Sequence, residues 1–192
     1  MPKVGMEPIR RKSLIEAALA AIHDRGSLDV TMSDIARRAG VSQGLAHHYF
    51  DSKEHLIVSA MRHLLSEYGR AVRARLPRAG TPRERVSAII SASLDRDQFQ
   101  PETVSAWLVF YVHAQSSPSA RRLLTVYSRR LISNLMHALR PLAGAQAGEV
   151  AEGVASLIDG LYIREALSAA GRQPIEPADL VERYVDRMLA AG

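Results

Sequence analysis

The segment 31–56 reads TMSDIARRAGVSQGLAHHYFDSKEHL, and it carries more structural information than any other part of the chain. Thr31 is followed three residues later by Asp34, a spacing close to that of a capping box, which predicts the start of a short helix. Gly40 predicts the end of this helix, because glycine adopts a left-handed C-cap most easily. Ser42 predicts the start of a second short helix. Two short helices joined by a glycine-containing turn predict a helix-turn-helix.

Small and apolar side chains should hold these two helices together. We expect Ile35, Ala36 and Ala39 to be buried, with Ala36 where the helices cross and Val41 filling the turn. The second helix should end near Tyr49. Its exposed side offers polar side chains and little apolar surface: Ser42, Gln43, His47 and His48. An exposed polar helix in this motif is typical of one that lies in the DNA major groove.

The rest of the chain has helical periodicity. Apolar residues recur at i, i+3 and i+4, which predicts helices over 9–23, 53–76, 82–94, 102–116, 119–140, 148–170 and 177–190. Pro174 and Pro177 lie where the last helix would start. No stretch alternates with period two for long enough to predict a strand. The expected fold class is all-α: a three-helix DNA-binding head over 1–52, then a helical ligand-binding and dimerisation domain over 53–192, with 53–76 as the linking helix.

Composition excludes several classes of protein. With 192 residues and no cysteine, the chain has no disulfide framework, thiol catalysis or cysteine-ligated zinc. No signal-peptide pattern or membrane-span window occurs, so we expect a cytoplasmic protein. No glycine-rich phosphate loop, nucleophile motif or metal signature is present, which predicts a protein that is not an enzyme and has no cofactor. His47, His48, Asp51 and His55 match no dedicated metal-ligand spacing.

The charge is unevenly distributed along the chain. The formal net charge is +5; residues 1–78 contain 13 Lys and Arg against 8 Asp and Glu, and residues 79–192 contain 12 of each. All the excess positive charge therefore lies in the front part, as expected for a front end that meets a polyanion. A solvated basic surface is the alternative explanation.

The segment 39–56 follows the pattern Ala-Gly-Val-Ser-x-Gly-x5-Phe-x2-Lys-x2-Leu. Preceded by a basic helix and followed by a long one, this pattern resembles the tetracycline-repressor (TetR) family of DNA-binding regulators, over residues 10–65. The chain departs from many members in having Ala-His-His-Tyr-Phe at 46–50 where they carry Leu-Tyr-x-His-Phe.

Further matches occur in both halves of the chain, at 1–11, 48–50, 106–108, 128–131 and 157–161. They are similar to the branch of the family that represses glycine-betaine synthesis in response to choline. The resemblance implies a repressor of the choline-to-betaine genes, relieved or modulated by choline. A TetR-type repressor that answers to a different cationic or lipophilic compound, for example one controlling efflux, is the alternative.

The DNA-contacting candidates combine residue chemistry with this resemblance. Gln43 can pair bidentately with adenine, and the imidazoles of the second helix can reach a base edge or a phosphate. The resemblance places some candidates at the DNA backbone, namely Thr31, Tyr49 and Lys53. It places others nearer the bases, namely Ser42, Gln43, His47 and His48. The candidates are Arg10, Arg11, Lys12, Thr31, Ser42, Gln43, Gly44, His47, His48, Tyr49 and Lys53.

Several residues in and around the motif also have a structural explanation. Thr31 and Ser42 are expected to cap helices with or without DNA. Tyr49 is equally consistent with packing and with a phosphate contact, and Phe50 is expected in the core. Arg37 and Arg38 are expected on a solvated face rather than in a specific DNA contact.

The back half contains the ligand candidates. Trp107, Phe110 and Tyr111 share one side of a predicted helix, and Asp159 interrupts an apolar stretch. Aromatic rings beside a carboxylate can hold a quaternary ammonium ion, which donates no hydrogen bond; choline as that ion rests on the resemblance. The candidates are Trp107, Phe110, Tyr111, Tyr127, Asp159 and Tyr162. The alternative is that the rings are core residues and that Asp159 pairs with Arg129, Arg130 or Arg164.

The last two predicted helices are expected to form a homodimer. They are rich in small residues that permit close packing: Ala147, Ala151, Gly153, Ala155 and Gly160. The resemblance implies a four-helix interface between two copies. Two-fold symmetry would then place two recognition helices about one DNA turn apart, on an inverted-repeat operator of double-stranded DNA. Ligand binding would shift the linking helix towards a state in which the two recognition helices have a different spacing.

Overall fold

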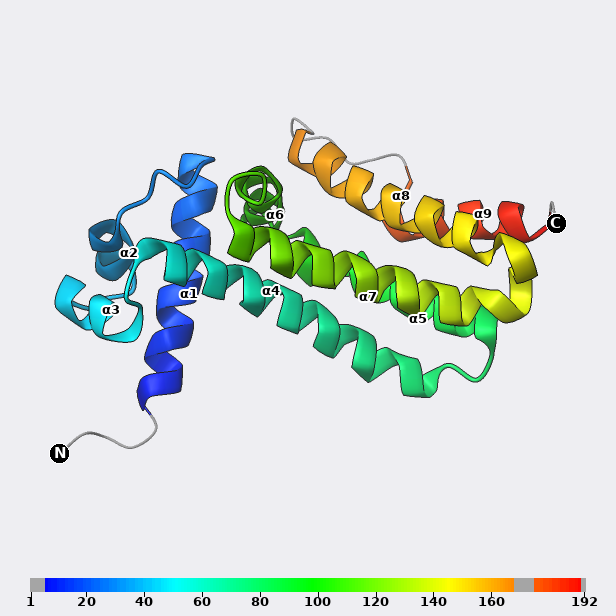
Figure 1. Cartoon of the computed structure of the whole chain (residues 1–192), viewed down its shortest axis with the longest axis horizontal. Helices are drawn as coiled ribbons and strands as arrows, with labels where there is room; N and C mark the ends of the chain where they lie inside the picture. Colours follow the sequence, from blue (N-terminus) through cyan, green and yellow to red (C-terminus); the bar gives the residue numbers. More distant parts are fainter. Residues whose placement is uncertain (1–5, 168–174, 191–192) are drawn as a thin grey trace. The chain divides into compact units, whose positions relative to one another are not determined.

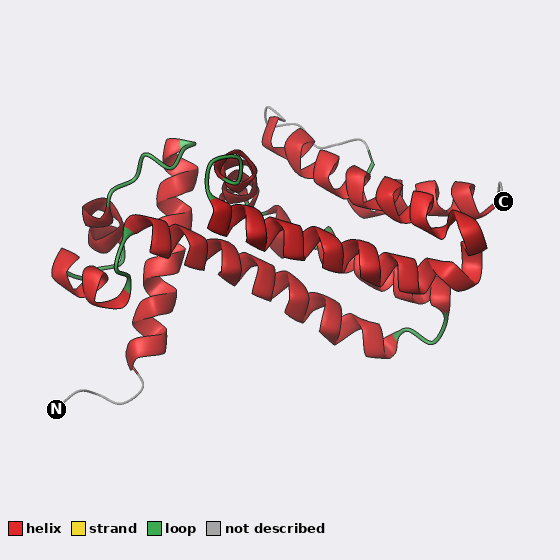
Figure 2. Cartoon of the chain, viewed as in Figure 1, coloured by secondary structure: helices red, strands yellow, loops and turns green. Residues whose placement is uncertain are grey.

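The computed structural model describes residues 6–167 and 175–190, and every regular element in these ranges is a helix (Figure 2). The α-helices are α1 (Met6–Arg25), α2 (Met32–Arg38), α3 (Gln43–Tyr49), α4 (Lys53–Arg75), α5 (Pro82–Ser93), α6 (Pro101–His113), α7 (Pro118–Ala143), α8 (Ala147–Leu167) and α9 (Pro177–Ala190). Short 3-10 helices lie at η1 (Leu76–Arg78), η2 (Arg96–Phe99) and η3 (Gly144–Gln146). The all-α prediction is confirmed.

Prolines mark the starts of four helices: α5, α6, α7 and α9 each begin with proline. The first amide of a helix has no partner within the helix, so proline loses nothing there. The predicted start at Pro177 is confirmed, whereas Pro174 and the predicted end of α8 at 168–170 lie outside the described residues, as do residues 1–5.

Three helices differ from the sequence prediction by two or three residues at an end, and the first of them, α1, runs over Met6–Arg25 instead of 9–23. α7 continues through Pro141 to Ala143 instead of ending at residue 140, because a proline in the last turn removes only one backbone hydrogen bond. Gly144, with a φ of +51°, follows its end. α6 ends at His113 rather than at residue 116, and its last carbonyls, of Val112 and His113, accept hydrogen bonds from amides of the turn that leads to Pro118.

The chain divides into two compact units. The first contains Met1–Leu64 and Pro101–Leu123, and the second contains Leu65–Gln100 and Leu124–Gly192. In the first unit α1 packs against α2 and α6, and α2 packs against α3 (Figure 1). Its fully buried side chains include Leu14, Ile22, Ile35, Phe50, Leu56 and Phe110. Each such side chain contributes roughly 1.5–3 kcal/mol relative to exposure.

In the second unit α9 packs against both α5 and α8 (Figure 1). The side chain of Arg83 on α5 bridges to α9, where it meets Glu182 and Asp186 at 2.6 Å each. Buried apolar residues of α5, α7, α8 and α9 fill the interior, among them Ile89, Ile90, Leu135, Ile158 and Val181.

Most of the small residues named for α8 pack within the single chain. Ala147, Ala151 and Ala155 are buried within the chain itself, and Gly153 faces Tyr184 of α9. Small side chains let two helices of one chain approach closely, so their presence is explained without a second copy. A Cβ at Gly160 would meet nothing within 4 Å, and the dimer interface through these helices stays a prediction.

Candidate DNA-binding surface and ligand-binding residues

Capping hydrogen bonds start both helices of the helix-turn-helix. Thr31 is the N-cap of α2, and its hydroxyl accepts from the amide of Asp34 at 3.0 Å. Ser42 is the N-cap of α3, and its hydroxyl accepts from the amide of Leu45 at 3.1 Å. Both capping predictions are confirmed. The caps satisfy amides that have no partner within their helices.

The turn between α2 and α3 is a Schellman motif. Gly40 has a φ of +67°; its amide donates to Arg37 O at 3.2 Å, and the next amide, of Val41, donates to Ala36 O at 3.0 Å. Ala36 is buried, as predicted. Ala39 is only half-buried, contrary to prediction, because it is the C-cap, where the chain leaves the helix.

The recognition helix α3 has one buried side and one exposed side. Ala46 is buried, and Phe50, which follows the helix, is buried as predicted. The residues of this motif predicted to lie nearest the bases are exposed: Ser42, Gln43, Gly44, His47 and His48. A row of polar side chains on one exposed helix face can donate to and accept from base edges in a major groove.

Tyr49 is half-buried, at the end of α3. The guanidinium of Arg11, on α1, lies 5.8 Å from the centroid of the Tyr49 ring and 5.3 Å from that of Phe50. Arg11 also donates to Glu7 at 3.1 Å. The Arg11 side chain therefore packs α1 against the end of the recognition helix, through cation–π contacts within about 6 Å.

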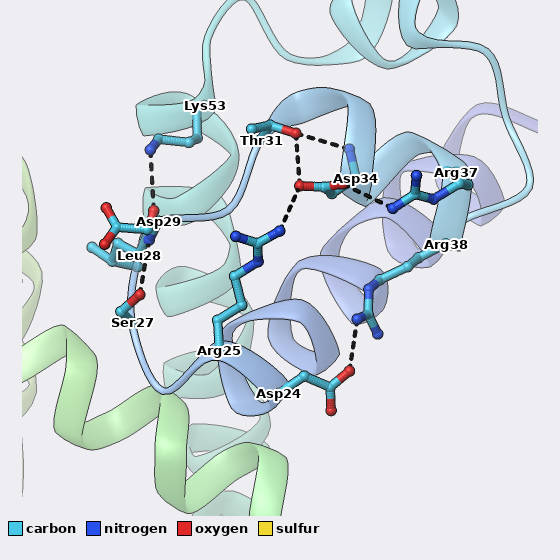
Figure 3. Close-up of polar contacts among 10 residues, drawn as sticks. All are labelled: Asp24, Arg25, Ser27, Leu28, Asp29, Thr31, Asp34, Arg37, Arg38 and Lys53. Atoms are coloured by element: carbon cyan, nitrogen blue, oxygen red, sulfur yellow. Dashed lines mark hydrogen bonds and ion pairs between the residues drawn. The ribbon is translucent and has the colours of Figure 1, made fainter.

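A polar network centred on Asp34 joins α1 to α2 (Figure 3). Its carboxylate accepts from the Thr31 hydroxyl at 2.9 Å, from Arg25 at 3.1 Å and from Arg37 at 2.8 Å. The hydrogen bond from Thr31, with the two arginines, holds the pKa of the Asp34 carboxyl below its ordinary value. Arg38 forms a second pair across the same helices, 2.7 Å from Asp24, so both neighbouring arginines have partners within the chain.

Lys53, predicted to hold a phosphate, is the first residue of α4. Its ammonium donates to the carbonyl of Leu28 at 3.1 Å and so holds the loop between α1 and α2 (Figure 3). The side chain is exposed, and an ammonium group has three donors. A phosphate contact is therefore compatible with the contact to Leu28. The other basic candidates lie on α1: Lys12 is 3.5 Å from Glu16, and Arg10 is half-buried.

The six ligand candidates are divided equally between the two units. On α6, in the first unit, Phe110 is fully buried and Trp107 is 4% exposed, whereas Tyr111 is half-buried. The Trp107 and Tyr111 ring centroids are 6.0 Å apart. Phe110 thus belongs to the core, as the structural alternative expects.

The end of α6 is tied to the first turn of α4 by Glu54. Its carboxylate lies 3.0 Å from His113 Nε2 and accepts from the Ser117 hydroxyl at 2.7 Å. Burial opposes ionisation of Glu54, but the hydrogen bond from Ser117 and the His113 ring outweigh it and lower the pKa of this carboxyl. The contact joins the helix that begins with Lys53 to the helix that carries Trp107.

In the second unit the candidates Tyr127 and Tyr162 each pair with an aromatic ring that sequence analysis did not identify. Tyr127 packs edge-to-face on Tyr68 with centroids 5.3 Å apart, and Tyr162 stacks on Phe99 at 4.9 Å. The Tyr162 hydroxyl donates to Ser93 O at 2.7 Å. Burial raises the pKa of Tyr162, and nearby Tyr68, Asp159 and Asp95 raise it further.

No group of three or more His, Asp or Glu side chains among the described residues is placed to hold a metal ion. Across residues 6–167 and 175–190, no helix is both long and apolar enough to span a lipid bilayer.

Comparison with known proteins identifies the family. Residues 14–60 match the model for bacterial regulatory proteins of the tetR family, and residues 82–190 match the model for the C-terminal part of BetI-type transcriptional repressors. The HTH-type transcriptional regulator BetI of Agrobacterium fabrum is 56% identical over 190 residues, which are 98% of this chain and 92% of the relative. The chain is a BetI-type member of the TetR family.

Solved structures of other transcriptional regulators have the same fold as this chain. A proposed transcriptional regulator from Pseudomonas aeruginosa PAO1 is 29% identical, with a TM-score of 0.82 over 95% of this chain and 91% of that one. A proposed regulator from Saccharomonospora viridis, solved in complex with choline, has a TM-score of 0.77 at 23% identity, over 94% of this chain and 95% of that one, which shows a shared fold.

The BetI-type assignment confirms that the chain is a DNA-binding transcriptional repressor with a helix-turn-helix, not an enzyme. For this BetI-type chain, sequence analysis missed the central role of Asp34 and the two added rings, Tyr68 and Phe99. The capping-box spacing pointed to Asp34. The two rings are separated in sequence from their partners, so no local pattern could indicate them.

Proposed function

We propose that this BetI-type regulator represses the genes that convert choline to glycine betaine, and that choline modulates its binding to DNA. The observation that carries the proposal is identity over nearly the whole chain, in both matched segments, to regulators named BetI. The choline complex of a protein with the same fold adds support for a quaternary ammonium ligand.

The exposed side of α3 supports the proposed DNA contacts. Gln43, His47 and His48 are proposed to meet base edges, with Ser42 and Gly44 close to them. The backbone contacts are assigned to hydroxyl and basic groups around the motif, which fix the register of the protein on the duplex. These are Arg10, Arg11, Lys12, Thr31, Tyr49 and Lys53.

A homodimer through α8 and α9 is part of the proposal, since TetR-family regulators usually dimerise. Large apolar side chains of these two helices are exposed in the single chain: Ile163, Leu167 and Leu180, with Leu167 77% exposed. Apolar surface of this kind is removed from water when two copies associate. Two recognition helices related by a two-fold axis require an inverted-repeat operator.

Fluorescence anisotropy tests the proposal. The DNA upstream of the chain's own gene is labelled and titrated with protein at several salt concentrations, with and without choline or glycine betaine. We expect tight, salt-sensitive binding that choline weakens and betaine does not. Tight binding that neither compound changes would retain the repressor and exclude choline as its ligand. Binding no tighter than to unrelated DNA would overturn the proposed target.

A further inference from the structure

Two buried tyrosines from different helices meet at the end of α5. The hydroxyl of Tyr162, on α8, donates to the carbonyl of Ser93 at 2.7 Å. The hydroxyl of Ser93 is 3.4 Å from that of Tyr68, on α4, and also donates to Ile89 O at 2.9 Å. Ser93 is the last residue of α5, so both phenol groups approach the C-terminal end of that helix.

Each of these tyrosines packs against a second aromatic side chain. Tyr127 of α7 meets Tyr68 edge-to-face at 5.3 Å, and Phe99 of η2 stacks on Tyr162 at 4.9 Å. We call Tyr68, Phe99, Tyr127 and Tyr162 the ring cluster. Tyr68 and Tyr162 are 7% and 5% exposed, whereas Phe99 and Tyr127 are half-buried and present ring surface to solvent.

Three sources of negative potential surround the ring cluster. The C-terminal end of α5 carries the partial negative charge of a helix end. Asp159 lies one turn before Tyr162 on α8, and Asp95 follows α5 by two residues. Asp95 forms an ion pair with Arg75, and burial, Tyr68 and the charges of Asp159 and Asp95 together raise the pKa of Tyr162.

We propose that the ring cluster and Asp159 bind the quaternary ammonium group of the ligand, so that Tyr68 and Phe99 contact it beside Tyr127 and Tyr162. This inference rests on the proposed function and specifies its binding site. A trimethylammonium group donates no hydrogen bond, so ring faces and a diffuse negative charge are what recognise it. The second unit supplies both kinds of group: the rings form two pairs that meet at Ser93, and Asp159 lies one turn from Tyr162 on α8.

The rings of α6 fit such a ligand less well. Trp107 and Phe110 are buried, as Tyr68 and Tyr162 are, so burial does not distinguish the two groups of rings. The single acidic residue of α6 is Glu102, which precedes Trp107 by five positions. At about 100° per residue, five positions place the carboxylate on a different side of the helix from the indole. The α6 rings therefore lack a carboxylate on their own helix face.

Isothermal titration calorimetry of the full chain tests the site. Choline is compared with 3,3-dimethylbutan-1-ol, which has the same shape but carbon in place of the charged nitrogen. We expect choline to bind at least about tenfold more tightly. Phe99→Leu, Tyr127→Leu and Asp159→Asn should each weaken choline binding about tenfold, whereas Tyr127→Phe, which retains the ring, should bind like the wild type.

Val126→Ala is the matched control, because Val126 precedes Tyr127 on α7 and is 43% exposed; choline affinity should not change. Unaltered melting and ligand-free operator binding establish that each variant is folded.

If the wild type does not bind choline, the proposed ligand and this site both fail. If the wild type binds choline, Tyr111→Leu abolishes binding, and the cluster variants bind normally, the site is overturned and the proposed function stands. Equal affinity for the neutral alcohol would also overturn cation recognition by the rings.

Discussion

At the scale of single residues, Gln43 and Lys53 test two different parts of the proposed DNA contact. Gln43 is exposed on α3, where a side-chain amide can make two hydrogen bonds to adenine. Gln43→Ala should weaken operator binding by about 1–3 kcal/mol and leave binding to unrelated DNA nearly unchanged. Lys53→Gln should weaken binding to both DNAs and reduce the salt slope by about one. Anisotropy titrations at several salt concentrations measure both effects.

Arg140→Gln is the control for charge, since Arg140 is exposed on α7 in the second unit and its loss also lowers the net charge by one. Its salt slope should equal that of the wild type. A Gln43→Ala variant that loses the same affinity for every DNA sequence would contradict base recognition by this residue.

Asp34 gives a prediction for pH. Its folded-state pKa is lowered from the ordinary value of 3.8, so its ionised form stabilises the fold above that value and the contribution is lost as the pH falls through the lowered pKa. Asp34→Asn should therefore be less stable than the wild type at about pH 7, and the difference should shrink towards about pH 3. Urea unfolding at a series of pH values measures it.

Asp29→Asn serves as the matched control, because Asp29 is exposed in the adjacent loop and its amide, rather than its carboxylate, is what bonds to Ser27 (Figure 3). It removes the same charge and should leave stability nearly unchanged across the series. The same pH-dependent loss in both variants would mean that net charge, and not the Asp34 network, is responsible.

At the scale of elements, the packing of α8 on α9 depends on one glycine. A Cβ at Gly153 would overlap the Tyr184 hydroxyl and lie 2.7 Å from its Cζ. Gly153→Ala should therefore destabilise the protein by about 1–3 kcal/mol, which exceeds the roughly 1 kcal/mol that alanine gains over glycine in a helix. Thermal and urea unfolding measure the change.

Gly160, on the same helix, supplies the control. A Cβ there meets nothing within 4 Å, so Gly160→Ala should be neutral or stabilising by up to about 1 kcal/mol. Adding Tyr184→Leu to Gly153→Ala should recover part of the lost stability, because the shorter side chain leaves room for the methyl group. Equal stability of the two alanine variants would show that Tyr184 moves aside at little cost.

Helix ends were predictable where one residue determines them. The hydroxyls of Thr31 and Ser42 accept hydrogen bonds from the amides that their spacing indicated, and Gly40 has the left-handed φ that ends α2. Periodicity shows that a helix has an apolar face, but it does not identify what that face packs against. Ala151 was therefore placed at a dimer interface although it is buried within the chain.

The proposed ligand site shows the same limit of sequence analysis. Tyr162 and Asp159 share a helix and were identified together, because a carboxylate in an apolar stretch is a local signal. Tyr68 and Phe99 reach Ser93 and Tyr162 only through the packing of α4 and η2 in the second unit. Contacts between elements this far apart in sequence have no local pattern.

At the scale of the whole molecule, the charge distribution favours a DNA complex in which only the front of each chain meets the duplex. The +5 surplus lies within residues 1–78, and residues 79–192 are balanced. A basic surface attracts any DNA through counterion release, which gives affinity without sequence preference. Preference for one operator must then come from α3, and from using two copies of it together.

The spacing of the operator half-sites tests that joint use. In the proposed dimer the two recognition helices are held at one separation, so both half-sites must lie on the same face of the duplex. Inserting about 5 base pairs at the operator centre turns one half-site to the opposite face, and affinity should fall to about that of a single half-site. Inserting about 10 base pairs returns both half-sites to the same face of the duplex but leaves them too far apart, so little of the affinity should be recovered. Anisotropy measures affinity, and sedimentation measures the number of chains bound. Affinity that the 5-base-pair insertion leaves unchanged would mean that each copy binds its half-site independently. That result would contradict the two-fold dimer and would leave the proposed helix-turn-helix contacts standing.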